Sequence, residues 1–484
     1  MSTDATFQAN PFDPDQTWTP GGFSLLTDVD SYKASHFLQY PPGTEYVSSY
    51  IEARGGKFDK QLFFGLQVWL KRYLSRAISL AEIDYAEQLW QAHGLPFNRE
   101  GWLHILNEHG GTLPLEIEAV AEGTRLPIRN VVVQVRNTDP KVPWLTSYVE
   151  TALLRAVWYP TTVATLSRHV KQIIRRYLQE SAERPEEELP FKLHDFGARG
   201  ATCYEAASLG GLAHLVNFLG TDTVSALLAA RTYYDEDMAG FSIPASEHST
   251  MTAWGKPREA DAYANMIRRF GGEGRIFAVV SDSYDLFGAI KDIWGGKLKQ
   301  QVMDNGGTLV VRPDSGNPIK VAVDVVERLG DMFGSRINAK GYRVLPDYLR
   351  VIQGDGVHAL SIEAILQRLL KRGWSAENIA FGMGGALLQR DIHRDTMNWA
   401  MKANAIRFKG EAAWTDVWKD PITDPGKSSK RGRLALIRED GQWKTIRKTE
   451  LAERDNLLVP VWRDGQLLRD QSLAEIRALS ECKY

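Results

Sequence analysis

Two charged side chains of opposite sign follow an apolar run near residue 310. In TLVVRPDSGNP, Arg312 and Asp314 come directly after the apolar residues, and Ser315, Gly316 and Asn317 form a turn that fixes them. An arginine can bind phosphate or cover an aromatic ring, and an aspartate can hold a ribose diol or a metal ion. An Arg–Asp pair that only caps the end of a strand would give the same pattern.

Two more carboxylates occupy corresponding positions after apolar runs, Asp282 in VVSDSYD and Asp355 in VIQGDGV. Capping alone does not easily account for both of these together with Asp314. The carboxylates would suit a sugar hydroxyl pair and a Mg²⁺ ion that accompanies a polyphosphate.

His248 lies beside Glu247 in PASEHSTM, at the end of another apolar run. A single histidine can be a hydrogen-bonded structural residue, or it can transfer a proton or accept a phosphate. No second histidine stands nearby at ligand spacing, which disfavours a zinc site here, and the absence of a G-x-S-x-G segment disfavours a serine hydrolase.

Two glycine-containing segments supply candidates for binding flat rings and phosphates. HDFGARG places Phe196 and Arg199 where they could stack a heteroaromatic ring beside an anion, although core packing of Phe196 is also compatible. In NIAFGMGGALLQ, Gly384 and Gly385 could let backbone N–H groups approach a phosphate. Leu387 stands where a dinucleotide fingerprint needs its third glycine, so a tight strand-to-helix turn is the alternative.

The elements that would position these residues alternate between strand and helix from Phe191 to Gln389. The expected strands end in polar residues or glycine and are FKLHDFG, FSIPASEH, IFAVVSDS, TLVVRPDSG, LRVIQGDG and NIAFGMGG. Such alternation predicts parallel strands with crossover helices, in a barrel or an open α/β sheet. In both architectures the active site lies at the carboxyl ends of the strands.

The flanking parts of the chain predict a different organisation. Helices are expected over Gln61 to Leu80 and Trp144 to Glu180, with the extended segment LPLEIEAVAEGTRLPIRNVVVQVRN between them. After Ala412, hairpins with D-G turns are expected in GRLALIREDGQWKTIRK and NLLVPVWRDGQLLRDQ, and they could join the N-terminal sheet. The basic run KSSKRGR is typical of a solvated loop.

Composition excludes several classes of protein. The 58 basic and 60 acidic side chains nearly cancel, so neither nucleic acid nor a membrane surface is expected as a partner. No apolar run has spanning length, and the start MSTDATFQANPFDPDQTW lacks a secretory signal and predicts a polar arm, so a cytoplasmic location is expected. The 2 cysteines exclude a disulfide framework, and Cys203 is expected to be a small buried apolar group.

Taken together, these segments resemble the nicotinamide phosphoribosyltransferases of the type II phosphoribosyltransferase family. The resemblance covers nearly the whole chain and is carried by strings such as TDVDSYKASHFLQYPPGTEYVSSYIEARGG, HLVNFLGTDTV, GFSIPASEHSTMTAWGK and KSSKRGRLAL. It implies an irregular TIM-like α/β barrel, a smaller β-rich domain built from both chain ends, and a homodimer with active sites at its interface. Residues 1–184 and 412–484 would contribute to the β-rich domain, and residues 185–411 would form the barrel core.

The resemblance also implies roles for individual residues. Phe196 and Tyr32 of the partner subunit would sandwich the pyridine ring beside Arg312, and Asp222 would accept a hydrogen bond from the carboxamide of nicotinamide. The ribose and metal side would be formed by Asp314, Gly354 and Asp355, with Asp314 and Asp355 as Mg²⁺ ligands. The phosphate-facing residues would be Gly384, Gly385, Arg394 and Lys402 for the 5-phosphate, and Arg54, Arg199, Lys419 and Lys427 for pyrophosphate.

The implied reaction is displacement of pyrophosphate from C1 of phosphoribosyl pyrophosphate by the ring nitrogen of nicotinamide, which makes nicotinamide mononucleotide for NAD synthesis. Asp314 and Mg²⁺ would stabilise the oxocarbenium-like state, and no general base is needed because the nitrogen has a free lone pair. His248, oriented by Asp282, would be phosphorylated by ATP, and hydrolysis of the phosphohistidine would drive synthesis.

Two positions depart from the family pattern, because Ala278 and Ala400 stand where serines are expected near the amide and the phosphate. Three alternatives stay open: a nicotinate phosphoribosyltransferase of the same fold, a non-enzymatic binding protein that kept the fold, and a barrel aldolase or isomerase acting on a sugar phosphate. The last is disfavoured because no lysine clearly follows a strand to form a Schiff base.

Overall fold

The computed structural model describes residues 22–424 and 427–482, which form two compact units. Of the described residues, unit 1 comprises 22–161, 394–424, 427–471 and 481–482, and unit 2 comprises 162–393 and 472–480. The division into residues 1–184, 185–411 and 412–484 stays a prediction. The predicted N-terminal arm lies outside the described residues.

Unit 2 is built on a six-stranded parallel sheet with the strand order β7-β6-β13-β12-β9-β8. Its strands are β6 (Leu193–Asp195), β7 (Gly220–Thr221), β8 (Ile276–Val280), β9 (Thr308–Arg312), β12 (Leu349–Gln353) and β13 (Ile379–Met383). β10 (Arg336–Ile337) and β11 (Arg343–Val344) form a separate antiparallel pair. The sheet confirms parallel strands at five of the six expected segments.

The expected strand FSIPASEH is wrong as a continuous strand. Only Phe241 and Ala245 pair, through isolated bridges to Gly220 of β7 and Ala278 of β8. Pro244 has no N–H group to donate to a ladder, which helps to explain why the pairing stays local. The described residues therefore form a parallel half-barrel sheet whose edge strands are each bridged to one extended segment, and not a continuously hydrogen-bonded barrel.

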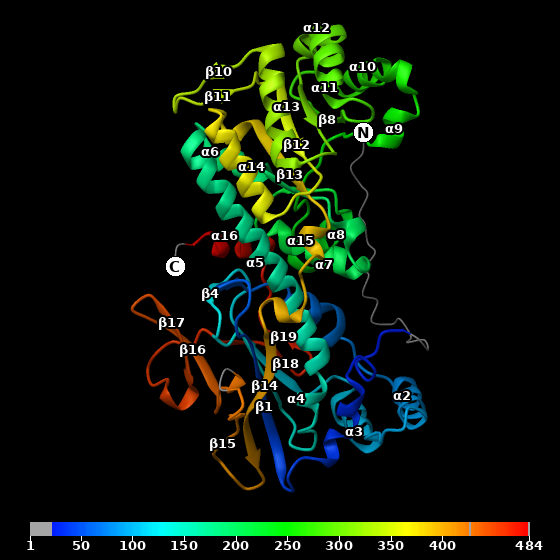
Figure 1. The fold of residues 1–484 in the computed structure, drawn as a ribbon. Helices are drawn as coiled ribbons and strands as arrows, with labels where there is room; N and C mark the ends of the chain where they lie inside the picture. Colours follow the sequence, from blue (N-terminus) through cyan, green and yellow to red (C-terminus); the bar gives the residue numbers. More distant parts are fainter. Residues whose placement is uncertain (1–21, 425–426, 483–484) are drawn as a thin grey trace, which may run out of the picture. The chain divides into compact units, whose positions relative to one another are not determined.

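Crossover helices follow the parallel strands, as the alternation predicted. The α-helices that begin in unit 2 are α6 (Pro185–Glu188), α7 (Tyr204–Leu215), α8 (Val224–Tyr234), α9 (His248–Thr252), α10 (Glu259–Phe270), α11 (Leu286–Gly288), α12 (Lys299–Asp304), α13 (Pro318–Phe333), α14 (Ala359–Lys371), α15 (Gly385–Leu388) and α16 (Leu473–Glu481), and the π-helical η6 (Ala289–Lys297) follows α11. α13 buries Ala322, Val326 and Leu329 and lies against β12 and α14 (Figure 1).

Unit 1 contains a seven-stranded antiparallel sheet with the order β15-β14-β1-β5-β3-β18-β19. Its strands are β1 (Thr44–Ala53), β3 (Leu115–Ala119), β5 (Val133–Asn137), β14 (Trp399–Phe408), β15 (Thr415–Asp416), β18 (Val459–Arg463) and β19 (Gln466–Leu467). The longest strands, β1 and β14, pair from Thr44 with Phe408 to Ala53 with Trp399 (Figure 1). Strands distant in sequence thus build one sheet.

Both expected C-terminal hairpins are confirmed. β16 (Leu434–Glu439) and β17 (Gln442–Arg447) flank Asp440 and Gly441, both at positive φ, but this hairpin forms its own two-stranded sheet. The second hairpin, β18–β19, turns at Asp464 and Gly465 and joins the large sheet by pairing with β3. Positive φ at both turn residues suits the right-handed twist of the strands.

The helices of unit 1 partly differ from the prediction. Gln61 lies in the strand β2 (Lys60–Leu62), which pairs with β4 (Arg125–Pro127), so the helix expected from Gln61 is wrong there. Helical structure begins only after Gly65, with α1 (Leu66–Trp69) and the π-helical η2 (Leu70–Leu74). The other helices are η1 (Ser31–Leu38), α2 (Leu80–Ala92), α3 (Arg99–His109), α4 (Leu145–Tyr148) and α5 (Glu150–Ser181), which contributes to both units and confirms the long helix expected there.

Candidate active site

The carboxyl ends of the parallel strands in unit 2 bring most of the predicted residues to one edge of the sheet. Because all six strands run in the same direction, the residues that follow them lie at the same edge. They are Phe196 after β6, Asp222 after β7, Asp282 after β8, Asp314 after β9, Gly354 and Asp355 after β12, and Gly384 and Gly385 after β13.

A continuous polar network joins four of the predicted residues at this edge. His248 Nε2 lies 3.0 Å from Asp282 Oδ1, and Asp282 Oδ2 accepts a hydrogen bond of 3.1 Å from the backbone N–H of Asp314. Arg312 Nη2 donates to both carboxylate oxygens of Asp314 at 2.9 Å. His248 Nδ1 is 3.9 Å from Asp314 Oδ2, so the imidazole stands between two carboxylates.

Local sequence explains why Asp314 is held in place. Gly316 adopts a φ of +86°, which favours glycine, and the side chain of Asn317 accepts hydrogen bonds from the N–H groups of Ile319 and Lys320 at the start of α13. Pro318 occupies the first position of that helix, where its missing N–H costs nothing. The D-S-G-N-P string is therefore a strand end, a turn and a helix cap in sequence.

The ring of Phe196 lies directly over the backbone of Gly382 in β13. A methyl group added at Gly382 would lie 2.0 Å from Cε2 of that ring. Phe196 also packs against three buried residues, Ala278, Val310 and Ile352. The Arg312 guanidinium lies 5.7 Å from the centre of the ring, so the half-buried Phe196 combines core packing with a cation at its face.

Three polar side chains near Asp222, those of Ser242, Asp195 and His194, were not singled out in the sequence analysis. Ser242 Oγ donates a hydrogen bond of 2.6 Å to Asp222 Oδ1, and it lies in the segment that bridges the edge strands. The buried Asp195 carboxylate accepts from the Gly197 N–H at 2.7 Å, and burial raises its pKa to about 6. Burial also lowers the pKa of His194, which favours the neutral imidazole beside the Asp222 charge. The sequence shows that FSIPASEH and FKLHDFG contain polar residues, but it does not show which groups these residues contact in the fold.

The glycine turn after β13 has the predicted strand-to-helix form. Gly385 begins the short helix α15, and Gly200 approaches it so closely that a methyl group on Gly200 would lie 2.8 Å from Gly385 Cα. This contact brings the turn that contains the exposed Arg199 beside the glycines. Cys203 follows that turn and is exposed, so its expected burial is wrong.

Gly354, which follows β12, lies close to the Arg312–Asp314 pair at the end of the neighbouring strand β9. A methyl group at Gly354 would be 3.2 Å from both Arg312 Nε and Asp314 Oδ1. Asp355 follows it with an exposed side chain. Two carboxylates thus follow neighbouring strands β9 and β12.

Unit 1 holds a separate cluster of cations that includes three predicted residues. Burial lowers the pKa of Lys402 in β14; Glu150 acts in the opposite direction, and the charges of Arg54, Lys33 and Lys419 lower it further. Arg54 Nε donates to Glu52 Oε1 at 3.1 Å, while its buried Nη2 has no partner among the described residues. Lys33, which the sequence analysis missed, binds Glu150 Oε2 at 2.7 Å. These cations repel one another, which suits an anionic ligand.

The remaining predicted residues of unit 1 are at its surface. The Tyr32 ring is 58% exposed and lies 5.0 Å from the ring of His36. Arg394 pairs with Asp395 at 3.0 Å, and Lys427 pairs with Asp424 at 3.0 Å.

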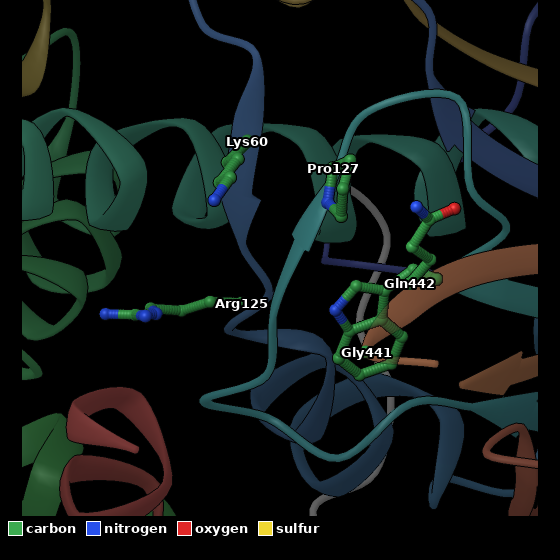
Figure 2. Close-up of a pocket in the computed structure, with 6 residues that line it drawn as sticks. Lys60, Arg125, Pro127, Gly441 and Gln442 are labelled. Atoms are coloured by element: carbon green, nitrogen blue, oxygen red, sulfur yellow. The ribbon is translucent and has the colours of Figure 1, made fainter. Parts of the chain in front are cut away.

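Unit 1 contains a cavity of about 290 Å³. Figure 2 shows its lining, formed by Lys60, Arg125, Pro127, Gly441, Gln442 and Trp443. Its lining contains none of the predicted site residues.

Among the described residues, no helix has the length and apolar character needed to cross a membrane.

Comparisons with known proteins agree with this geometry. Residues 191–457 match the nicotinate phosphoribosyltransferase (NAPRTase) family, and residues 24–117 match the N-terminal domain of nicotinamide phosphoribosyltransferase. The chain is 53% identical to nicotinamide phosphoribosyltransferase of Xanthomonas campestris pv. campestris, covering 94% of this chain and 97% of that protein. It is 32% identical to the enzyme of the same name from Acinetobacter baylyi, covering 93% and 96%.

Two solved structures share the fold. Nicotinate-nucleotide pyrophosphorylase from Pyrococcus furiosus matches with a TM-score of 0.60 and 16% identity, covering 96% of this chain and 97% of that one. Human nicotinic acid phosphoribosyltransferase matches with a TM-score of 0.56 and 17% identity, covering 93% and 92%.

The fold, the sheet edge and these matches together define a phosphoribosyltransferase. The chain belongs to the nicotinate phosphoribosyltransferase family, and the curated relatives that it matches over nearly its full length are nicotinamide phosphoribosyltransferases.

Proposed function

We propose that this enzyme transfers the 5-phosphoribosyl group from phosphoribosyl pyrophosphate to nicotinamide, giving nicotinamide mononucleotide and pyrophosphate in NAD salvage. The observation that carries the proposal is the sheet edge where the Phe196 ring, the Arg312 guanidinium and the Asp314 and Asp282 carboxylates form one connected arrangement. It offers a stacking surface for a flat ring beside carboxylates for a ribose and its cationic transition state.

In this proposal the pyridine ring stacks on Phe196 beside Arg312, and Tyr32 of the partner subunit covers its other face. The active enzyme is then a cytoplasmic homodimer with shared sites, and the exposed Tyr32 is available for such a contact. The Asp222 carboxylate, held by Ser242, accepts a hydrogen bond from the carboxamide. Ala278 packs against the Phe196 ring, and its methyl side chain offers no hydroxyl group to the carboxamide.

The phosphates are bound by two groups of residues. Gly384 and Gly385, with Arg394 and Lys402, hold the 5-phosphate, and Ala400, two residues before Lys402, offers no hydroxyl to it. The pyrophosphate-binding residues are Arg54, Arg199, Lys419 and Lys427. The mutual repulsion of Lys402, Arg54 and Lys419 supports this assignment, because a bound anion would relieve it.

The transfer forms a bond between the ring nitrogen and C1 of the ribose and breaks the bond from C1 to the pyrophosphate oxygen, which leaves with the electron pair. Asp314 stabilises the positive charge that develops on the sugar, and Gly354 with Asp355 holds the ribose hydroxyls. Asp314 and Asp355, which follow neighbouring strands, fit a hard cation such as Mg²⁺. When bound, Mg²⁺ supplies charge neutralisation for the leaving pyrophosphate.

The direct test is mononucleotide formation by the purified enzyme with phosphoribosyl pyrophosphate and Mg²⁺, comparing nicotinamide with nicotinate, with and without ATP. A strong preference for nicotinamide supports the proposal. Preference for nicotinate would favour a nicotinate phosphoribosyltransferase of the same fold. Turnover of neither substrate would favour a non-enzymatic binding protein.

Asp222 is expected to set that preference. The change Asp222→Asn removes the charge that attracts the amide N–H and repels the nicotinate carboxylate, so the ratio of kcat/KM for nicotinamide over nicotinate should fall about 10- to 100-fold. Asp235→Asn is a matched control, since Asp235 ends α8 with a φ of +50° that asparagine also accepts. An unchanged ratio in Asp222→Asn would remove this residue from the specificity argument.

His248 is proposed to couple ATP hydrolysis to synthesis. With Nε2 bound to Asp282, Nδ1 is the nitrogen that attacks the γ-phosphorus of ATP. The P–O bond to the β-phosphate breaks and ADP leaves, and water later cleaves the P–N bond.

The variant His248→Ala should abolish stimulation by ATP and acid-labile labelling from γ-labelled ATP, while ATP-independent synthesis continues. His358→Ala, at the cap of α14, is the control for loss of an imidazole in unit 2. Stimulation that persists in His248→Ala would exclude the phosphohistidine.

A further inference from the structure

Two histidines and an aspartate converge in unit 1, on elements that carry none of the residues assigned to the transfer reaction. His104 and His109 lie on α3, and Asp139 lies in the loop after β5. The Nε2 atoms of both rings are 2.7 Å from the same atom, Asp139 Oδ2. The three ligand atoms lie within 4.8 Å of one another.

The loop holds Asp139 in this position without help from the histidines. Its Oδ1 accepts a hydrogen bond of 2.8 Å from the backbone N–H of Lys141, which leaves Oδ2 directed at the two rings. The side chain of the fully buried Asn137 donates to the Asp139 carbonyl at 2.7 Å. The carboxylate is therefore oriented before any ligand arrives, as the outer contacts of a metal site normally ensure.

The charge and exposure of the cluster also suit a cation. An aspartate carboxylate is ordinarily ionised near neutral pH, so Asp139 offers a negative charge at the point where the two imidazole rings meet. The side chains are 18%, 28% and 14% exposed for His104, His109 and Asp139. They are thus neither sealed in the core nor freely rotating in water.

We propose that His104, His109 and Asp139 form a binding site for Zn²⁺ or a similar divalent transition metal. Two imidazole nitrogens and one carboxylate oxygen form a donor set that Zn²⁺ accepts, with water in the fourth position. Ligand atoms around a tetrahedral Zn²⁺ stand about 3.3 Å apart, so the 2.7 Å contacts must open by about half an ångström. Small side-chain rotations can supply that movement.

The ion would tie the end of α3 to the loop after β5. His109 is the last residue of α3 and is followed by Gly110 in the left-handed conformation, so the metal would fix this helix terminus to the loop after β5. Binding to the folded state alone raises the stability of unit 1. The role that follows for the ion is to hold α3 against the loop after β5 within unit 1.

The test is Zn²⁺ binding by the full chain, measured by competition with a chromophoric chelator after removal of bound metal. We expect one tight equivalent that His104→Asn, His109→Asn and Asp139→Asn each weaken by more than about 100-fold, because even outer contacts of a metal site contribute 10- to 100-fold. His93→Asn, an exposed histidine of the same unit at the end of α2, should leave binding unchanged.

Two further measurements keep the result decisive. Co²⁺ should give intense visible absorption of a four-coordinate nitrogen–oxygen site in the wild-type protein, and this needs no variant to fold. His248→Asn tests the His248–Asp282 contact at the sheet edge, which could bind Zn²⁺ adventitiously. Equal binding in the three cluster variants and in His93→Asn, loss of the tight equivalent in His248→Asn, or no tight equivalent at all would overturn the proposal.

Discussion

Replacing Gly382 with alanine is expected to lower kcat/KM for nicotinamide by about 100-fold or more. The added methyl group would lie 2.0 Å from Cε2 of Phe196, far inside van der Waals contact, so the ring must move by more than an ångström. A displacement of about 1 Å in a positioning group can cost about 100-fold in rate. Steady-state kinetics with nicotinamide and phosphoribosyl pyrophosphate measures the loss.

The variant Gly330→Ala separates this effect from general destabilisation. Gly330 is in the same unit but near the end of α13, not at a strand end. Its added methyl group would lie 2.3 Å from the buried ring of Trp374. We expect a lower melting temperature and near-normal kcat/KM at low temperature for Gly330→Ala. If both variants lose activity in proportion to stability, Phe196 is not positioned by Gly382 in the way proposed.

The strand ends of unit 2 were predictable because their sequence is unambiguous. Runs such as IFAVV and TLVVR are buried on both faces, and each is followed at once by polar or turn-forming residues. The turn expected at Ser315, Gly316 and Asn317 follows Asp314 in the structure, and α13 begins directly after it. Residue type and position relative to a strand were therefore enough to place Asp314, Asp282 and Phe196 at one edge.

The parts that were not predicted depend on partners far away in sequence. β7 has only two residues, too few to give a periodic pattern, and Gln61 was assigned to a helix although its neighbours pair with β4. The contacts of Asp222 with Ser242 and of Lys33 with Glu150 join residues 20 and 117 positions apart. Strand order and chain path determine these contacts, and neither is encoded locally.

The contacts of His248 at the sheet edge and of His104 and His109 in unit 1 illustrate the same difference. His248 stood out because it follows an apolar run that ends at the sheet edge. His104, His109 and Asp139 carried no such signal, since the histidines are five residues apart on α3 and the carboxylate comes from another element. Their convergence follows from the packing of α3 against the loop after β5. A spacing rule for metal ligands cannot detect a site assembled in this way.

The change Asp314→Asn is expected to lower kcat by about 100- to 1,000-fold with a smaller effect on KM for nicotinamide. Asparagine keeps the shape of the side chain but loses the negative charge that would face the developing oxocarbenium, and removing one such electrostatic group typically costs about that much. The change also replaces the charged carboxylate that accepts two hydrogen bonds from Arg312 with a neutral amide. Because the contact to Asp282 comes from the Asp314 backbone N–H, the variant should leave the His248–Asp282 contact in place.

Asp347→Asn is the matched control for this change. Asp347 also faces an arginine, Arg350, at 3.6 Å, but its side chain is 87% exposed and it precedes β12, at the edge of the sheet opposite the strand ends. Loss of an exposed pair of this kind costs about 1 kcal/mol or less and should leave kcat unchanged. A kcat within a few-fold of the wild type in Asp314→Asn would mean that its carboxylate serves only to hold Arg312. Catalytic charge stabilisation would then have to come from Asp355 and from the Mg²⁺ ion that we propose binds there.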